Sequence, residues 1–334
     1  MPEENDTNLF KRVADHAKVS PSTVTLALQD SPRISLETKE RVFKASRHVR
    51  YRETRVRDKQ HWNFAVVYGQ TSAQDTLATS PDASIVGTLA NRAGELGVSL
   101  FVQSDNRTNL NLNFRDFPSM LRRDQIDGVL LVGVVNESFL AFLREVRIPV
   151  VLAGNAETKQ PVDQVKLDYR QATRHMIGEL LQRGHRKFAF VTAAASIPVN
   201  REMFDAFREE LEHAGCFDET LVRSTKDAYA KLDLVESLFQ GSNQPTLVFA
   251  TTWRMANHTA ILAARNGVAF DSGFEIASAY PDAISDLGYP LHLIVPNIAE
   301  LGSRALERLV VLRENPDQKR LKLLVPCSTL LQAS

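Results

Sequence analysis

Cysteine is nearly absent from this chain of 334 residues, which carries only Cys216 and Cys327. Two cysteines cannot form a disulfide framework or a zinc cage, so we expect both to be inert, small hydrophobic side chains. Long apolar runs are also missing, because the longest, residues 128–135, is far below the roughly 20 residues that cross a bilayer. The N-terminal segment has no apolar stretch typical of a signal peptide. We therefore expect a cytoplasmic protein with no membrane partner.

The motifs of several enzyme classes are missing as well. The chain has no G-x-G-x-x-G and no G-x-S-x-G, and its histidines are never within four residues of one another. Gly128 and Gly133 have the spacing of a P-loop, but Val134 and Val135 follow where lysine and a hydroxyl residue are needed. The sequence therefore predicts no enzyme, no metal site and no cofactor.

The charges balance over the whole chain but not along it. Forty Lys and Arg face forty Asp and Glu, so the molecule as a whole is not a polycation. Residues 1–60 hold 13 basic and nine acidic side chains, whereas the remainder holds 27 and 31. A small basic head thus precedes a slightly acidic body. This pattern is compatible with an ordinary solvated surface or with local nucleic-acid binding.

Three short helices are predicted in the head. The first follows a cap at Thr7 or Asn8, the second begins at Ser20 and Pro21, and the third covers about 35–49. Only a tight turn separates the first two. Such a pair is typical of the helix-turn-helix, whose second helix enters the DNA major groove. A purely structural three-helix cap is the alternative.

Several residues of the head stand at fixed offsets that point to one family. They are Val13-Ala14, residues 17–25 (AKVSPSTVT), Ile34-Ser35, Thr38, Arg41-Val42 and Tyr51. This run resembles the N-terminal domain of the LacI/GalR family of bacterial transcription regulators. The resemblance implies binding to double-stranded DNA. A homodimer is expected, because one such head contacts too few base pairs for selectivity.

The resemblance also implies which side chains contact DNA. The positions that face base edges in the family correspond to Pro21, Ser22 and Leu26. Serine can bond either type of base pair, whereas leucine can only contact a thymine methyl group. Further contacts, mainly to phosphates, are expected from Ser20, Lys18, Thr23, Lys44 and Arg47. Lys18 stands where the family usually has a turn glycine, so we expect a strained or reshaped turn at a cost of about 1 kcal/mol.

The linker at residues 52–61 departs from the family pattern. Relatives continue with proline and asparagine and carry a leucine that wedges into the minor groove. This chain reads RETRVRDKQH, without leucine, and is about four residues shorter than usual. Its basic side chains, Arg52, Arg55 and Arg57, can still enter a narrow minor groove, or the segment is a disordered tether. Weaker operator bending is expected.

From residue 62 onward, apolar strand-like runs alternate with helical segments. Strands are predicted at 64–68, 98–102, 129–132, 150–152, 187–192, 246–250 and 274–279. Helices are predicted at 84–96, 115–123, 137–145, 169–183, 200–214, 228–239 and 254–266. The pattern indicates an α/β body of two doubly wound parallel sheets.

This body resembles the two-lobed, periplasmic-binding-protein-like core of the same family. The matching segments include residues 126–128 (IDG), 148–151 (IPVV), 184–187 (GHRK) and 300–302 (ELG). The predicted domains are a head at 1–51, a linker at 52–61 and a body at 62–334. The resemblance places lobe 1 at 62–158 and 288–317, and lobe 2 at 159–287 and 318–334, with a small-molecule effector bound between them. Gly184 is expected at positive φ, and His185 as a turn residue rather than a ligand.

The effector positions diverge most from the family. The position of the family's effector arginine is Met203, and Arg201 could substitute for it. The other candidates are Ser72, Thr252, Trp253, Tyr280 and Asp282. Two aromatic rings suit stacking on a sugar or a base. The alternative is that these rings only pack between lobes or subunits.

The sequence therefore predicts a homodimeric transcription regulator, with repression as the expected sign, controlled by a sugar-like effector. Two alternatives stay open. One is a cytoplasmic solute-binding protein without gene control, and the other is a DNA-binding regulator that has lost its effector response.

Overall fold

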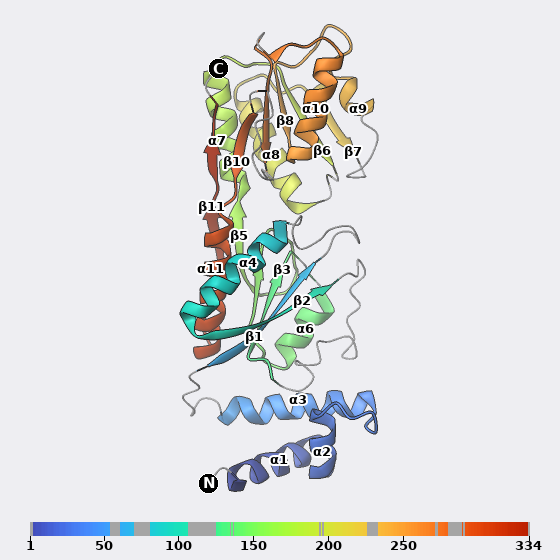
Figure 1. Cartoon of the computed structure of the whole chain (residues 1–334), viewed down its shortest axis with the longest axis vertical. Coiled ribbons are helices and arrows are strands. Elements are labelled where there is room, and N and C mark those ends of the chain that lie inside the picture. Colours follow the sequence, from blue (N-terminus) through green and yellow to red (C-terminus); the bar gives the residue numbers. More distant parts are fainter. Residues whose placement is uncertain are drawn as a thin grey trace. The chain divides into compact units, whose positions relative to one another are not determined.

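The computed structural model describes residues 3–53, 61–69, 81–105, 125–133, 135, 137–193, 195, 197–225, 233–270, 273–279, 289 and 291–332. Three helices come first in the chain, and strands that alternate with helices follow (Figure 1). The predicted helix at 115–123 and most of the linker lie outside the described residues.

The head consists of α1 (Glu3–Ala17), α2 (Pro21–Leu28) and α3 (Leu36–Glu53). The Ser20 hydroxyl caps α2 by accepting the Thr23 N–H at 3.1 Å, and Pro21 begins the helix. Lys18, in the preceding turn, has φ +54°, so the expected backbone strain is confirmed. The helices enclose a small core made of Val13, Ala14, Ala17, Val24, Ala27, Val42, Ala45 and Val49.

Two helices of the head are longer than the sequence predicted. α1 begins at Glu3, before the expected caps at Thr7 and Asn8, and α3 continues past Val49 to Glu53. No glycine or proline occurs between Leu36 and Glu53, so nothing in that stretch ends the helix. The backbone of Arg52 therefore belongs to α3 and not to a separate linker.

The first α/β unit is built on a six-stranded sheet of order β11-β5-β4-β3-β1-β2. Its strands are β1 (Trp62–Gly69), β2 (Val98–Asp105), β3 (Gly128–Val132), β4 (Val150–Ala153), β5 (Asp163–Asp168) and β11 (Lys322–Pro326). The ladders β1–β2, β1–β3, β3–β4 and β4–β5 are parallel. On one face α11 (Ile298–Glu314) packs against α4 (Pro81–Leu96), and on the other α6 (Glu137–Glu145) buries Phe139, Leu140 and Leu143.

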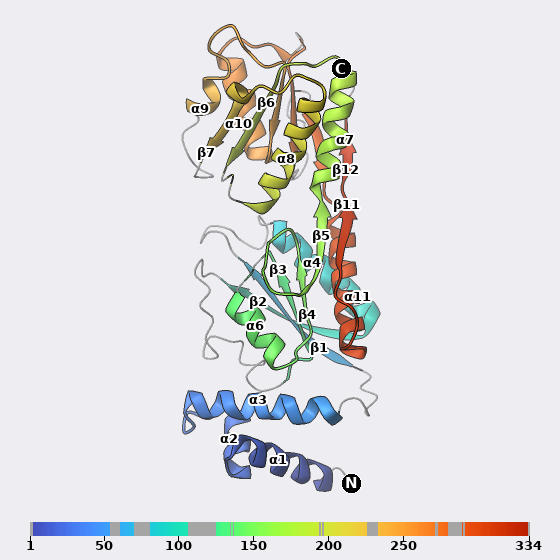
Figure 2. The same ribbon diagram turned by 180° about the vertical axis from the view of Figure 1, so that it is seen from behind.

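The second unit repeats this architecture with the strand order β12-β10-β9-β8-β6-β7. Its strands are β6 (Phe188–Ala193), β7 (Val222–Thr225), β8 (Leu247–Ala250), β9 (Glu275–Ala279), β10 (Leu291–Val295) and β12 (Ser328–Leu330). Only the last pair, β10–β12, is antiparallel among the ladders described. One face is covered by α7 (Tyr169–Gln182) and α8 (Pro198–His213), the other by α9 (Asp233–Glu236) and α10 (Trp253–Arg265), and the short 3₁₀ turn Glu219–Leu221 leads into β7 (Figure 2).

The chain passes between the two units three times. Unit 1 contains residues 1–165 and 298–323, and unit 2 contains 166–297 and 324–334. The predicted lobe boundaries lie a few residues earlier at each crossing. At the first and third crossings the chain passes between the units within β5 and β11 themselves. At the second crossing, β10 (Leu291–Val295), which the sequence placed in lobe 1, belongs to unit 2. We call unit 1 without its head lobe 1, and unit 2 lobe 2.

Among the described helices, none is long and apolar enough to cross a membrane. The two cysteines are partly buried, and burial raises the pKa of the Cys327 thiol to about 12. Burial also raises the pKa of Cys216. Neither thiol is therefore activated as a nucleophile at neutral pH.

Candidate DNA-binding and effector sites

The exposed face of α2 is made of hydroxyl groups. Ser20 Oγ lies 2.8 Å from Ser22 Oγ and 2.8 Å from Thr23 Oγ1, and both Pro21 and Ser22 are exposed. Leu26 is half-buried, so only part of its side chain can contact a base. Hydroxyl groups donate and accept hydrogen bonds, which suits them to base edges and to phosphate oxygens alike.

Thr25 belongs to the same face, although the sequence analysis did not select it as a site residue. It is exposed, and its hydroxyl donates to the Pro21 carbonyl at 3.2 Å. Residues three apart lie on the same side of a helix, and Thr25 follows Ser22 by three. The helical spacing in the sequence was therefore enough to predict that Thr25 lies on this face.

The predicted phosphate contacts fall into two groups. Lys18 is exposed beside the start of α2. In contrast, Lys44 Nζ lies 2.9 Å from Glu145 of α6, and Arg47 donates to the Ile126 carbonyl at 3.2 Å. In this structure Lys44 and Arg47 therefore both contact lobe 1. Their roles as phosphate contacts remain predictions, as do those of Arg52, whose side chain is not described, and of Arg55 and Arg57, which lie outside the described residues.

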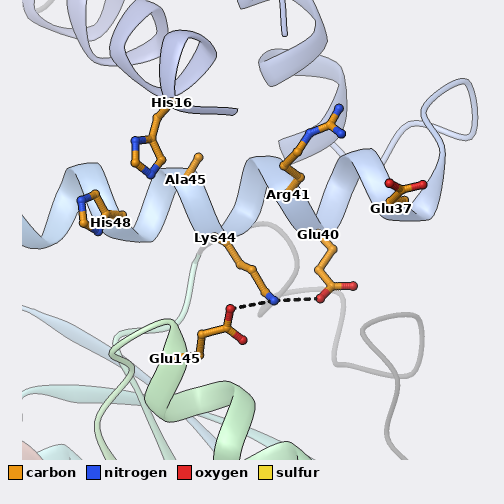
Figure 3. A pocket seen from close by; sticks show the side chains of 8 residues that line it. All are labelled: His16, Glu37, Glu40, Arg41, Lys44, Ala45, His48 and Glu145. Carbon is orange, nitrogen blue, oxygen red and sulfur yellow. Dashed lines mark ion pairs between the residues drawn. The ribbon is translucent and has the colours of Figure 1, made fainter. Parts of the chain in front are cut away.

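A cavity of about 530 Å³ opens beside these contacts (Figure 3). Its lining comes from α1, α3 and α6 and consists of His16, Glu37, Glu40, Arg41, Lys44, Ala45, His48 and Glu145. The rings of His16 and His48 stack with centroids 4.7 Å apart. The described residues contain no cluster of ligands that could hold a metal ion. Sequence patterns did not indicate this cavity, because its residues come from distant segments.

The strand order of lobe 2 marks a candidate site for a small ligand. The chain leaves β6 toward β7 on one side, whereas β8 lies on the other, so the order reverses between β6 and β8. Ligands of open α/β sheets bind at the carboxyl ends of the strands at such a point. The N-terminal ends of α8 and α10 follow these two strands. Each brings unsatisfied N–H groups to that edge of the sheet.

Three of the predicted effector residues belong to these helix starts. Thr252 caps α10, with its hydroxyl accepting the Met255 N–H at 3.3 Å, and Trp253 is half-buried beside it. Arg201 is exposed on the first turn of α8. The structure therefore brings Arg201, Thr252 and Trp253 to one edge of one sheet. Ser72, Tyr280 and Asp282 lie outside the described residues.

Met203 is fully buried on α8, in the position where the resemblance places an effector arginine. A buried thioether cannot contact a ligand as a cation would. Thr192 and Thr251 add buried hydroxyl groups near the ends of β6 and β8, and the Thr251 hydroxyl donates to that of Thr192 at 3.1 Å. These two threonines were not predicted, because hydroxyl groups inside apolar strands carry no signal of a site.

At the opposite ends of the lobe 2 strands lies a buried polar cluster. Glu275 Oε2 is 3.0 Å from His185 Nε2 and 2.8 Å from His292 Nε2. His185 also contacts the Thr246 hydroxyl at 3.0 Å, and Gly184 before it has φ +100°, as expected. The cluster links the starts of the four strands β6, β8, β9 and β10.

The comparisons with known proteins agree with this geometry. Residues 10–53 match the family of bacterial regulatory proteins of the lacI type. Residues 77–287 match the periplasmic binding proteins and sugar binding domain of the LacI family. A curated relative, catabolite control protein A of Priestia megaterium, is 25% identical over 89% of this chain and 90% of its own length. Another, the HTH-type transcriptional regulator DegA of Bacillus subtilis, is 23% identical over 87% of both chains.

Solved structures show the same fold. A Lac repressor dimer bound to operator and an anti-inducer has a TM-score of 0.67 at 18% identity, over 95% of this chain and 96% of that one. The transcriptional regulator CelR in complex with cellobiose has a TM-score of 0.64 at 20% identity, over 96% and 98%. Because one family match spans the head and a second spans more than half of the chain, this protein belongs to the LacI family of bacterial regulatory proteins.

Proposed function

We propose that this chain is a sequence-specific, DNA-binding transcription regulator of the cytoplasm, with repression as its sign, and that a sugar-like effector controls it. The observation that carries the proposal is the exposed hydroxyl face of α2, which Ser20 caps within a helix-turn-helix head. This arrangement leaves Pro21, Ser22 and Thr25 free to enter a major groove.

A homodimer fits this function. One head covers only a half-site, whereas two heads related by a two-fold axis contact half-sites about one helical turn apart. Sedimentation of the purified chain should give twice the monomer mass of 37.3 kDa. A monomer at micromolar concentration that still selects a palindromic duplex would contradict the dimer.

The DNA-binding part of the proposal is tested by a charge placed on α2. Ser22→Glu puts a carboxylate against the phosphate backbone, and duplex affinity should fall at least about tenfold, since each lost or repelled contact costs roughly 1–3 kcal/mol. Ser138→Glu on α6 is the matched control, because Ser138 is exposed on lobe 1 and should leave affinity unchanged. Deletion of residues 1–60 should abolish binding, and duplex retention by that truncated chain would refute the assignment.

The effector part of the proposal rests on the carboxyl edge of the lobe 2 sheet. Titration calorimetry with cellobiose, other sugars and nucleobases should identify a ligand, and Trp253→Ala should weaken it about tenfold by removing a stacking surface. Arg265→Ala, at the far end of α10, is the control and should bind normally. If no sugar or base binds, the alternative of a regulator without effector response is favoured instead.

A further inference from the structure

Helix α3 has two faces with different partners. At 100° per residue, Val42, Ala45 and Val49 share one side, and all three belong to the core of the head. Phe43, Lys44 and Arg47 occupy the opposite side. α3 therefore packs on α1 and α2 with one face while presenting an aromatic ring and two cations with the other.

The aromatic ring is buried by lobe 1. Phe43 is 0% exposed and belongs to the hydrophobic core cluster of lobe 1 rather than to that of the head. Its ring stacks on Phe142 of α6 with centroids 6.0 Å apart and planes 15° apart. Phe43 therefore contributes buried apolar surface to the contact between the head and lobe 1.

The two cations also contact lobe 1. Lys44 Nζ is 5.5 Å from the Phe142 ring centroid. It also forms an ion pair with Glu145 at 2.9 Å (Figure 3). Partial burial acts to lower the pKa of Lys44, but hydrogen bonds to Glu145 and Glu40 raise it above its usual value. Arg47 donates to the Ile126 carbonyl, at the residue before Asp127, whose carboxylate accepts the Asn63 N–H of β1 at 3.0 Å. We call Phe43, Lys44, Arg47, Ile126, Phe142 and Glu145 the α3 seat.

The α3 seat leaves the DNA-reading helix open, since Pro21, Ser22 and Thr25 are exposed while α3 is docked. The linker sequence has no leucine to wedge into the minor groove. Building on the proposed function, we propose that the α3 seat stays closed on DNA. The head and lobe 1 then move as one body, and a displacement of lobe 1 reaches α2 through α3 rather than through the linker.

Spin labels test whether the seat stays closed. Lys11→Cys on α1 and Ser138→Cys on α6 provide exposed positions, in a chain whose Cys216 and Cys327 are alanine. Labelled protein is diluted with unlabelled protein to remove distances between subunits. The distance distribution between the labels should be narrow in the free chain. The distribution should stay equally narrow when a duplex of random sequence is added. A length of about 40 base pairs is enough for both heads of a dimer to bind.

Two variants break the seat from opposite sides. Phe43→Gln and Phe142→Gln should each broaden the distribution at least twofold while leaving the helix content of the head intact, because neither side chain belongs to the head core. A broad distribution in the parent chain overturns the proposal. A distribution that is narrow in the free chain but broad on the duplex also overturns it, since docking would then hold the head away from DNA. Failure of the parent to bind the duplex at all would contradict the proposed function instead.

Salt dependence gives an independent measurement. A lysine that contacts phosphate contributes about one unit to the slope of log affinity against log salt. In contrast to the phosphate contact that the sequence led us to expect for Lys44, Lys44→Gln should leave the slope unchanged, because Lys44 stays with Glu145. Lys18→Gln should reduce the slope by about one. A reduction by Lys44→Gln would show that this lysine leaves the seat for phosphate, and the proposal would fail.

Discussion

At the residue scale, Lys18 occupies a turn position where the family usually has glycine, and its backbone φ angle shows the consequence. A side chain with a Cβ at φ +54° lies in the left-handed region, which glycine enters without strain. The turn nevertheless closes, because the Val19 N–H reaches the Ala14 carbonyl at 3.0 Å. The head core thus holds Lys18 in a conformation that its own side chain disfavours.

Lys18→Gly should therefore stabilise the chain by about 1 kcal/mol against urea unfolding. Lys18→Ala is the control, since it removes the same charge but keeps the Cβ, and should change stability by less than about 0.5 kcal/mol. Equal stability of the two variants would show that the turn carries no strain.

The His292–Glu275 pair predicts how stability changes with pH. The Gln332 N–H donates to His292 Nδ1 at 3.2 Å, so Nε2 carries the proton that His292 donates to Glu275. Burial lowers the pKa of His292 below 6.5, against the hydrogen bond to Glu275, which raises it, while Arg183 and His185 lower it further. Burial acts to raise the pKa of Glu275, yet the hydrogen bonds from His292 and His185 hold it below 4.5.

Both groups have lower pKa values in the folded chain than in the unfolded chain. As the pH falls, the unfolded chain therefore binds more protons than the folded chain does. The free energy of unfolding should decrease below about pH 6.5 through His292 and again below about pH 4.5 through Glu275. His292→Gln should cost roughly 1–3 kcal/mol at pH 7.5 and should remove the first of these decreases. Urea titrations of both chains at pH 7.5 and 5.5 measure the difference, and an unchanged decrease in the variant would exclude His292 as its source.

At the element scale, the close approach of α4 and α11 depends on Gly302. A Cβ at this position would overlap the Thr88 hydroxyl oxygen, which donates to the Ile85 carbonyl at 2.8 Å. Glycine is therefore required by a neighbouring helix rather than by a positive φ.

Gly302→Ala should destabilise the chain by about 1–3 kcal/mol through overpacking. Gly87→Ala on α4 provides the opposite expectation, because no neighbouring atom lies within 4 Å of the point that its Cβ would occupy, and alanine favours a helix by up to about 1 kcal/mol. Thermal unfolding of both variants measures the contrast. Stabilisation by both would mean that the two helices can separate without cost.

Periodicity and capping residues predicted most elements, since Ser20-Pro21 and the apolar strands carry local signals. Among the segments missed, β10 (Leu291–Val295) and α11 (Ile298–Glu314) carry local apolar patterns. β5 instead depends on distant partners. Asp163, at the start of β5, is fully buried and accepts hydrogen bonds from Arg308 at 2.7 Å and Arg320 at 3.1 Å. Those residues lie 145 and 157 positions away in the sequence. The polar and charged residues of β5 therefore gave no local pattern that predicts a strand. The α3 seat was missed for the same reason, because Phe43 and Phe142 meet only after folding.

At the scale of the whole molecule, the linker sequence predicts how strongly the protein bends its operator. Residues 52–61 contain no leucine, so we expect this segment to lack the apolar wedge that opens a base step in the minor groove. Circular-permutation mobility should therefore show weaker operator bending than a wedge produces. Val56→Leu restores a longer aliphatic side chain in this segment and should increase the bend, whereas a sharp central kink in the parent complex would refute the prediction.

The division of unit 1 into residues 1–165 and 298–323 has a consequence for synthesis on the ribosome. The head and the strands β1 to β4 emerge early, but α11, which packs on α4 and β4, is among the last segments to be made. The head of a nascent chain is thus made well before α11 and β11 can complete the unit that buries Phe43. Termination after residue 297 should therefore leave the head without part of the unit on which it packs.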